Sequence, residues 1–174
     1  MQNANENLAK LTPSDLSPAG PIVERGLFVQ PPEGWNVFKP VAGEAGRLIQ
    51  FLSPDGLARL NVAVQDGDGG DLHHIVLAAV AVIQATGHEV VKVLRERDRE
   101  GQPCATVFAQ GVEGLLGLPY SITTTLKVSS GRVAVLESVY FSDEAVDAYL
   151  PALHDAVMAA CWVPAATGVR HASA

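Results

Sequence analysis

Residues 47–65, RLIQFLSPDGLARLNVAVQ, decide the fold because they predict a β-hairpin. Two runs rich in apolar residues flank the Pro-Asp-Gly sequence at 54–56, and these residue types are typical of a tight turn. In the second run, residues 58–65, apolar and polar side chains alternate, which places on one face Leu60, Val62 and Val64. This alternation is typical of a strand in an antiparallel sheet.

The chain on either side of this hairpin predicts further strands. Short extended segments precede it at 27–30 and 35–39, and two more hairpins follow it at 89–110 and 120–141. In the last hairpin one face of the sheet is expected to be partly solvated, because that face carries Ser121, Thr123, Thr125 and Lys127.

Two helices are predicted among these strands. The first spans Leu72 to about Thr86, with Asp71 as its N-cap. The second begins after Phe141, and Pro151 either kinks it or starts its main part. The order of elements predicts an α+β fold whose antiparallel sheet has about six to seven strands and is flanked by two helices.

A chain of 174 residues corresponds to one domain with tails. We predict a flexible arm at residues 1–25, a single α+β domain at 26–164 and a flexible tail at 165–174. No stretch reaches the roughly 18 apolar residues of a membrane span. The N-terminus lacks the basic start and apolar run of a signal peptide. A cytoplasmic location is therefore expected, although a secreted form with its leader removed would look the same.

Charge and cysteine usage argue against two classes of site. The net charge is −7 and the 12 basic residues are scattered, so no surface for nucleic acid is expected. The charge run at 95–100 alternates in sign and predicts a solvated hairpin end. Cys104 and Cys161 form no CxxC pattern, so a zinc site is not expected. We interpret them as two buried thiols, and a disulfide between them stays open.

Three local patterns resemble the PsbP/DcrB-like superfamily. They are LFVQPPEGW at 27–35, the hairpin that leads into the mid-chain helix, and YFSDEAVDAYLPALHDAVMAACWVP at 140–164. The resemblance covers about residues 22–164 and implies a PsbP-like α/β/α sandwich. Members of this superfamily include photosystem accessory subunits, secreted lipoproteins, a nuclear-transport factor and secretion chaperones. The resemblance therefore implies a binding or accessory role, and it carries over no functional residue.

The loop after the first hairpin contains one candidate metal site. Its carboxylates, Asp66, Asp68 and Asp71, are of the type that binds calcium. Their spacing departs from the EF-hand pattern, because Gly70 and Leu77 stand where ligands belong. We expect a loop and a helix cap with no metal or cofactor, and a weak metal site in this loop is the alternative.

No catalytic motif is present in the sequence. The chain has neither a GxxxxGK[ST] phosphate loop nor a GxSxG nucleophile elbow. Glu137, His88 and Cys104 supply the residue types for a dispersed catalytic site, but nothing in their spacing brings them together. We therefore predict that the protein is not an enzyme, with a site of these three residues as the alternative.

Four apolar residues are candidates for partner binding. Leu115, Leu116 and Leu118 lie in a Gly-rich connection where polar turn residues are usual. They either fold over the core or form an exposed contact patch. Trp35 is either an anchor under the sheet or a ligand-facing ring. The sequence thus predicts a non-catalytic protein-binding, chaperone or assembly-accessory module. Its partner is another protein or a second copy of this chain, as in a homodimer.

Overall fold

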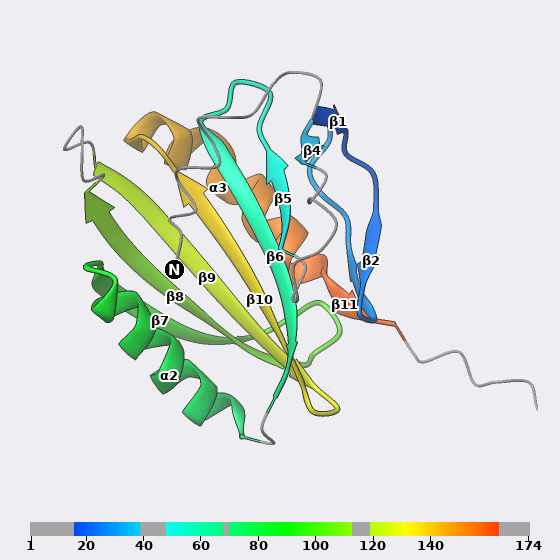
Figure 1. The fold of residues 1–174 in the computed structure, drawn as a ribbon, viewed down its shortest axis with the longest axis vertical. Helices are drawn as coiled ribbons and strands as arrows, with labels where there is room; N and C mark the ends of the chain where they lie inside the picture. Colours follow the sequence, from blue (N-terminus) through cyan, green and yellow to red (C-terminus); the bar gives the residue numbers. More distant parts are fainter. Residues whose placement is uncertain (1–15, 39–47, 68–69, 113–118, 164–174) are drawn as a thin grey trace, which may run out of the picture.

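The computed structural model describes residues 16–38, 48–67, 70–112 and 119–163. They form an α+β fold with two helices and two antiparallel sheets (Figure 1). The main sheet has eight strands in the order β1-β4-β5-β6-β10-β9-β8-β7, and the small sheet has three in the order β11-β3-β2. The elements are β1 (Leu16–Pro18), β2 (Ile22–Glu24), β3 (Leu27–Val29), β4 (Asn36–Phe38), β5 (Ile49–Leu52), β6 (Ala58–Asp66), α2 (Leu72–Ala85), β7 (Glu89–Arg97), β8 (Pro103–Val112), β9 (Pro119–Ser129), β10 (Arg132–Tyr140), α3 (Asp143–Ala159) and β11 (Cys161–Trp162).

The three predicted hairpins and the antiparallel pairing are confirmed. The main sheet has one or two strands more than expected, and a second sheet stands beside it. The additional strands β1, β2 and β11 have only two or three residues each. Runs this short contain no alternation that a sequence pattern could reveal.

The fold begins before the predicted domain boundary at residue 26. In β1, Ser17 lies opposite Val37 of β4. In β2, Val23 lies opposite Phe28 of β3. Both segments therefore belong to the sheets. Residues 1–15 and 164–174 are outside the described residues, so the flexible arm and tail stay predictions there.

Both predicted helices are present. The side chain of Asp71 caps α2 by accepting a hydrogen bond from the backbone N–H of His74, as expected. The hydroxyl of Ser142 caps α3 in the same way, with the N–H of Ala145 as donor. Pro151 lies inside one continuous helix and does not start a new one. No helix in the described residues is long and apolar enough to cross a membrane.

The helices cover opposite faces of the main sheet, as the sandwich prediction requires. We call these the α2 face and the α3 face. On the α2 face, Val76 of the helix packs against Ala105 and Leu126. On the α3 face, Leu153 and other helix residues join the main core, which also contains Leu60, Leu136, Tyr140 and residues of the small sheet. In Figure 1, α3 passes behind β6 and β10.

The expectation that the α3 face is partly solvated is wrong at Thr125 and Lys127. Both residues are buried, and the Lys127 side chain is only 2% exposed. Its ammonium donates to Asp98 Oδ2 at 3.2 Å, to the Met158 carbonyl at 3.3 Å and to the Ala160 carbonyl. The end of α3 lies over this part of the face and supplies two of these acceptors. Asp98 belongs to the predicted solvated charge run and is buried as well.

Candidate binding site

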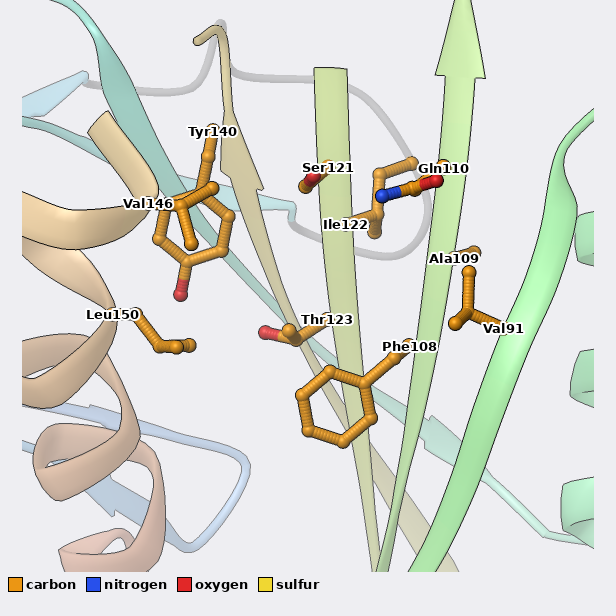
Figure 2. Close-up of a pocket in the computed structure, with 10 residues that line it drawn as sticks. All are labelled: Val91, Phe108, Ala109, Gln110, Ser121, Ile122, Thr123, Tyr140, Val146 and Leu150. Atoms are coloured by element: carbon orange, nitrogen blue, oxygen red, sulfur yellow. The ribbon is translucent and has the colours of Figure 1, made fainter. Parts of the chain in front are cut away.

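A small pocket lies on the α3 face, between α3 and strands β8 and β9 (Figure 2). We call it the α3 pocket. Its volume is about 160 Å³. Apolar side chains predominate among the residues that line it, which are Val91, Phe108, Ala109, Gln110, Ser121, Ile122, Thr123, Tyr140, Val146 and Leu150.

Two neighbouring strands and one helix bring the main lining residues together. Phe108 of β8 lies opposite Thr123 of β9, so both side chains point to the α3 face. Val146 and Leu150 are four residues apart on α3, and this spacing places them on the same side of the helix. Tyr140 ends β10 and closes the pocket between the strands and the helix. The helix thus forms one wall and the strands form the other.

The Tyr140 hydroxyl is the polar group of interest in this pocket. Tyr140 is 1% exposed, and its hydroxyl has no hydrogen-bond partner of normal geometry in the described part of the chain. Figure 2 shows it pointing toward the space between Leu150 and Thr123. Burial raises the pKa of the Tyr140 hydroxyl, while the nearby hydroxyls of Thr123 and Ser138 oppose this rise. A buried hydroxyl without a well-formed hydrogen bond costs free energy, which a polar group of an occupant would recover.

The size of the α3 pocket limits what can occupy it. A cavity of roughly 150 Å³ lined by apolar residues holds one benzene molecule. Pockets for drug-sized ligands and cofactors are about 300–1,000 Å³. The α3 pocket, with about 160 Å³, therefore has room for one ring or one branched side chain.

The pocket borders the open edge of the main sheet. Strand β7 is the last in the sheet order, so one side of its backbone pairs with no other strand of that sheet. A β-bulge interrupts its pairing between Val90 and Lys92. The bulged residue, Val91, is 59% exposed and lines the pocket. An extended segment of another molecule can therefore reach the pocket from this edge.

The α2 face carries a row of polar side chains across three strands. Gln50 of β5 donates to Asn61 Oδ1 of β6 at 3.1 Å, and Asn61 donates to Glu137 Oε1 of β10 at 2.7 Å. Arg59 precedes Asn61 by two residues in β6, so its side chain lies on the same face. It is also buried. This row fixes the Glu137 carboxylate, one of the three residues of the alternative catalytic site.

The structure does not bring Glu137, His88 and Cys104 together. Glu137 lies opposite Thr124 on the α2 face, and His88 hydrogen-bonds to Tyr120 on that face. Cys104 lies opposite Lys127 on the α3 face, so the sheet separates its thiol from the other two groups. Burial raises the pKa of the Cys104 thiol, although Lys127 opposes this, and a raised pKa reduces the thiolate needed for nucleophilic attack.

The two cysteines are free thiols in the structure. Cys104 is buried as expected, whereas Cys161 in β11 is only half-buried. The indole of Trp35 is buried in the main core, where it meets the Tyr149 ring edge-to-face at 5.7 Å. This burial favours the anchor under the sheet, and a role of Trp35 in partner binding stays a prediction.

Some of the remaining predicted site residues already make contacts within the fold, and the others lie outside the described residues. Asp66 pairs with Arg25 at 2.6 Å, and Asp71 caps α2. No group of three or more His, Cys, Asp or Glu side chains in the described residues could hold a metal ion. Asp68 lies outside the described residues, and the same is true of Leu115, Leu116 and Leu118. The contact patch formed by these leucines stays a prediction.

Comparison with solved structures identifies the fold as PsbP-like. The chain is similar to cyanobacterial PsbP (CyanoP) from Synechocystis sp. PCC 6803, with a TM-score of 0.61 and 13% identity over 88% of this chain and 95% of that chain. It is also similar to PA94 from Pseudomonas aeruginosa, a protein of unknown function, with a TM-score of 0.57 and 12% identity over 84% of this chain and 100% of that chain. A structure from Bacteroides thetaiotaomicron gives a TM-score of 0.56 and 11% identity over 85% of this chain and 50% of that chain. At these identities the similarity shows the fold alone.

No protein-family model and no curated protein sequence matches the chain. The PsbP-like fold that the sequence resemblance implied is nevertheless confirmed by the solved structures.

Sequence reasoning missed the residues of the α3 pocket. Val146 and Leu150 carry a weak signal, because two apolar residues four apart mark one side of a helix. Phe108 carries another, since it alternates with Cys104 and Thr106 along β8. Neither signal reveals a pocket, which depends on the distance between α3 and the edge strands.

Proposed function

We propose that the protein is a non-catalytic binding module that holds one apolar side chain of a partner protein in the α3 pocket. The observation that carries this proposal is the pocket itself. It has a volume of about 160 Å³, a mainly apolar lining and one buried hydroxyl that makes no hydrogen bond of normal geometry within the described residues. This volume suits a single ring or branched side chain.

The shape of the surrounding surface favours a protein partner over a small molecule. A pocket for one side chain buries too little of a free metabolite to hold it tightly, since affinity per atom is limited. A side chain on a polypeptide adds the contacts of its neighbours. The exposed Val91 on the open edge of β7 provides such a contact beside the pocket. The PsbP-like fold agrees with an accessory or binding role.

The first test measures whether the pocket prefers a ring with a polar tip. We would titrate the protein with toluene and with p-cresol, which are analogues of the Phe and Tyr side chains, and follow NMR signals of Phe108, Thr123 and Leu150. Both compounds should shift these signals, and p-cresol should bind more tightly because it reaches the Tyr140 hydroxyl. Tyr140→Phe should remove the preference for p-cresol without removing toluene binding.

The second test addresses the partner. Peptides selected against the protein from a displayed random library should share one aromatic or branched residue. Leu150→Lys should weaken their binding about tenfold or more, because it places a charge in an apolar pocket. The matched control is Leu77→Lys on the exposed side of α2, which should leave binding unchanged. The proposal fails if neither ring compound shifts the pocket signals, or if Leu150→Lys and Leu77→Lys bind the peptides equally well.

The predicted patch at Leu115, Leu116 and Leu118 gives a separate route to a partner, in particular a second copy of this chain. Changing all three residues to Ser should abolish self-association while the fold survives, if the patch is an interface. A large loss of stability with unchanged association would instead return these leucines to the core. Analytical ultracentrifugation and thermal unfolding distinguish these results. A cytoplasmic location also remains part of this proposal.

A further inference from the structure

Arg59 is a buried cation on the α2 face, on the opposite side of the sheet from the α3 pocket. Its side chain is 7% exposed. Within the described residues, neither Nε nor Nη1 of its guanidinium has a hydrogen-bond partner, and no carboxylate forms an ion pair with it. A guanidinium stays charged in proteins and offers five N–H donors. A buried guanidinium whose donors are unmatched is costly, so it favours any anion that reaches it.

The immediate surroundings of Arg59 are aromatic and partly negative. The Phe141 ring lies 5.8 Å from the guanidinium carbon. Burial lowers the pKa of Arg59, while Glu137 and Tyr120 favour its charged form. Glu137 is held by Asn61 at 2.7 Å, outside ion-pair distance of the guanidinium. The neighbours therefore keep the cation in place without pairing with it.

His88 and Tyr120 form a fixed polar pair on the same face. Thr86 Oγ1 donates to the Ile83 carbonyl at 2.8 Å and also contacts His88 Nδ1 at 2.8 Å. Because the Thr86 proton is used, His88 Nδ1 must be the donor in this second bond. The other nitrogen of a neutral His88 then accepts a hydrogen bond from the Tyr120 hydroxyl.

The backbone leaves space for this pair. Gly111 of β8 lies opposite Tyr120 of β9. A Cβ at Gly111 would come within 2.6 Å of His88 Cδ2 and 2.8 Å of Tyr120 Cζ. Such distances are far below van der Waals contact, so a side chain at this position would displace the rings. Glycine is therefore required here for space rather than for an unusual backbone angle.

We propose that Arg59 is the centre of a second binding site, which takes an oxyanion of the carboxylate or phosphate class. Phe141 lies beside the guanidinium, which supplies the charge, and Tyr120, the partner of His88, is near enough to influence that charge. The unmatched Nε–H and Nη1–H groups point to different sides of the guanidinium, and each can donate a charge-assisted hydrogen bond to an anion oxygen. The low dielectric around a buried guanidinium strengthens this interaction relative to a surface arginine. The site is independent of the α3 pocket, because it lies on the other face of the sheet.

The test uses inorganic phosphate and acetate as probes, with sodium chloride at equal ionic strength as the reference. The NMR signal of the Arg59 Nε–H group and the thermal unfolding midpoint are measured against anion concentration. At least one anion should shift the Arg59 signal and raise the midpoint, which is the linkage expected when a ligand binds the folded state. The response to acetate against phosphate assigns the anion to the carboxylate or the phosphate class.

Arg59→Met removes the charge and keeps the side-chain volume. It should weaken anion binding about tenfold or more. The matched control, Arg95→Met, changes an exposed arginine of β7 that contacts His73, and it should respond like the unmodified protein. If Arg59→Met fails to fold, Arg59→Lys keeps the charge but loses the fork of donors, so the acetate response should still decrease. The proposal is overturned if neither anion shifts the Arg59 signal, or if Arg59→Met and Arg95→Met respond equally.

Discussion

Two cations are buried on opposite faces of the same sheet, and they differ in how many hydrogen-bond acceptors surround them. Lys127 on the α3 face has three acceptors, namely Asp98 Oδ2 and the carbonyls of Met158 and Ala160. Arg59 on the α2 face has two guanidinium nitrogens with no partner in the described residues. Burying a charge is costly in both places, but only the first cost is offset within the described fold.

This difference separates a structural role from a binding role. Lys127 joins three segments that are distant in sequence: strand β9, the turn after β7 and the end of α3. Asp98 contributes to this junction twice, because it also accepts hydrogen bonds from the N–H groups of Glu100 and Gln102. Arg59 joins nothing comparable. A fully paired buried cation indicates a structural clamp, whereas an unpaired one is a candidate for ligand binding.

Removing the paired cation should have the largest effect on stability. Lys127→Met leaves the Asp98 carboxylate buried without its cation and frees two carbonyls at the end of α3. We expect a loss of about 3–5 kcal/mol in the free energy of unfolding, measured with urea. The control Lys92→Met, at an exposed position of β7, should change it little. Adding Asp98→Asn to Lys127→Met should recover part of the loss, and strict additivity of the two changes would contradict a coupled pair.

Adding a side chain at a crowded position of the α2 face, which also carries Arg59, should have the next largest effect on stability. Gly111→Ala forces a Cβ into the space of His88 and Tyr120. Overpacking of this kind costs about 1–3 kcal/mol, and chemical denaturation would measure it. Gly20→Ala is the matched control, since a Cβ there meets nothing within 4 Å. Equal effects of the two substitutions would show that the His88–Tyr120 pair is not tightly packed. The same variant should also disturb anion binding at Arg59.

Weakening the N-terminal cap of α3, the helix whose C-terminal end accepts hydrogen bonds from Lys127, should have a smaller effect on stability. Ser142→Ala removes the hydroxyl that accepts from the Ala145 N–H at the start of α3. The loss of such a cap costs about 1 kcal/mol. Ser142→Asp should restore the stability, because a carboxylate both caps the helix and meets its positive end. Thermal unfolding of the three proteins gives the comparison, and a Ser142→Asp protein no more stable than Ser142→Ala would contradict the capping role.

The smallest predicted effect concerns α2 and pH. The backbone N–H of His74 donates to Asp71 and holds the pKa of that carboxyl below its ordinary value. The folded protein therefore releases this proton more readily than the unfolded chain. The resulting stability is fully present above the ordinary carboxyl pKa of about 3.9, and it is lost as the pH falls through the lower pKa of the folded state. Asp71→Asn keeps a capping side chain that does not titrate.

Urea midpoints at pH 6 and pH 3 would measure this contribution. The unmodified protein should lose more stability than Asp71→Asn between these two values. Identical pH profiles of the two proteins would show that the cap makes no contribution that depends on protonation. Asp66, whose pKa is lowered by its hydrogen bond from Arg25, adds a dependence of the same sign in both proteins.

The sequence by itself determined the elements and their order. Alternation along 58–65, the turn residues at 54–56 and the capping side chain of Asp71 are local signals, because each acts between neighbours in the chain. These signals predicted three hairpins, two helices and an antiparallel α+β fold, and the family resemblance implied its PsbP-like type. The very short strands β1, β2 and β11 were not predicted, since each forms only by pairing with another strand.

Only the tertiary structure decided which polar groups are buried and which of them are paired. Lys127 occupies a position in β9 that alternation assigns to a solvated face, and it is buried because the end of α3 lies over it. The α3 pocket likewise depends on the separation of Leu150 from Phe108, which are distant in the chain. The exposure of a strand face depends on what packs against it, and no local pattern contains that information. For the same reason, the contrast between Lys127 and Arg59 became visible only in three dimensions.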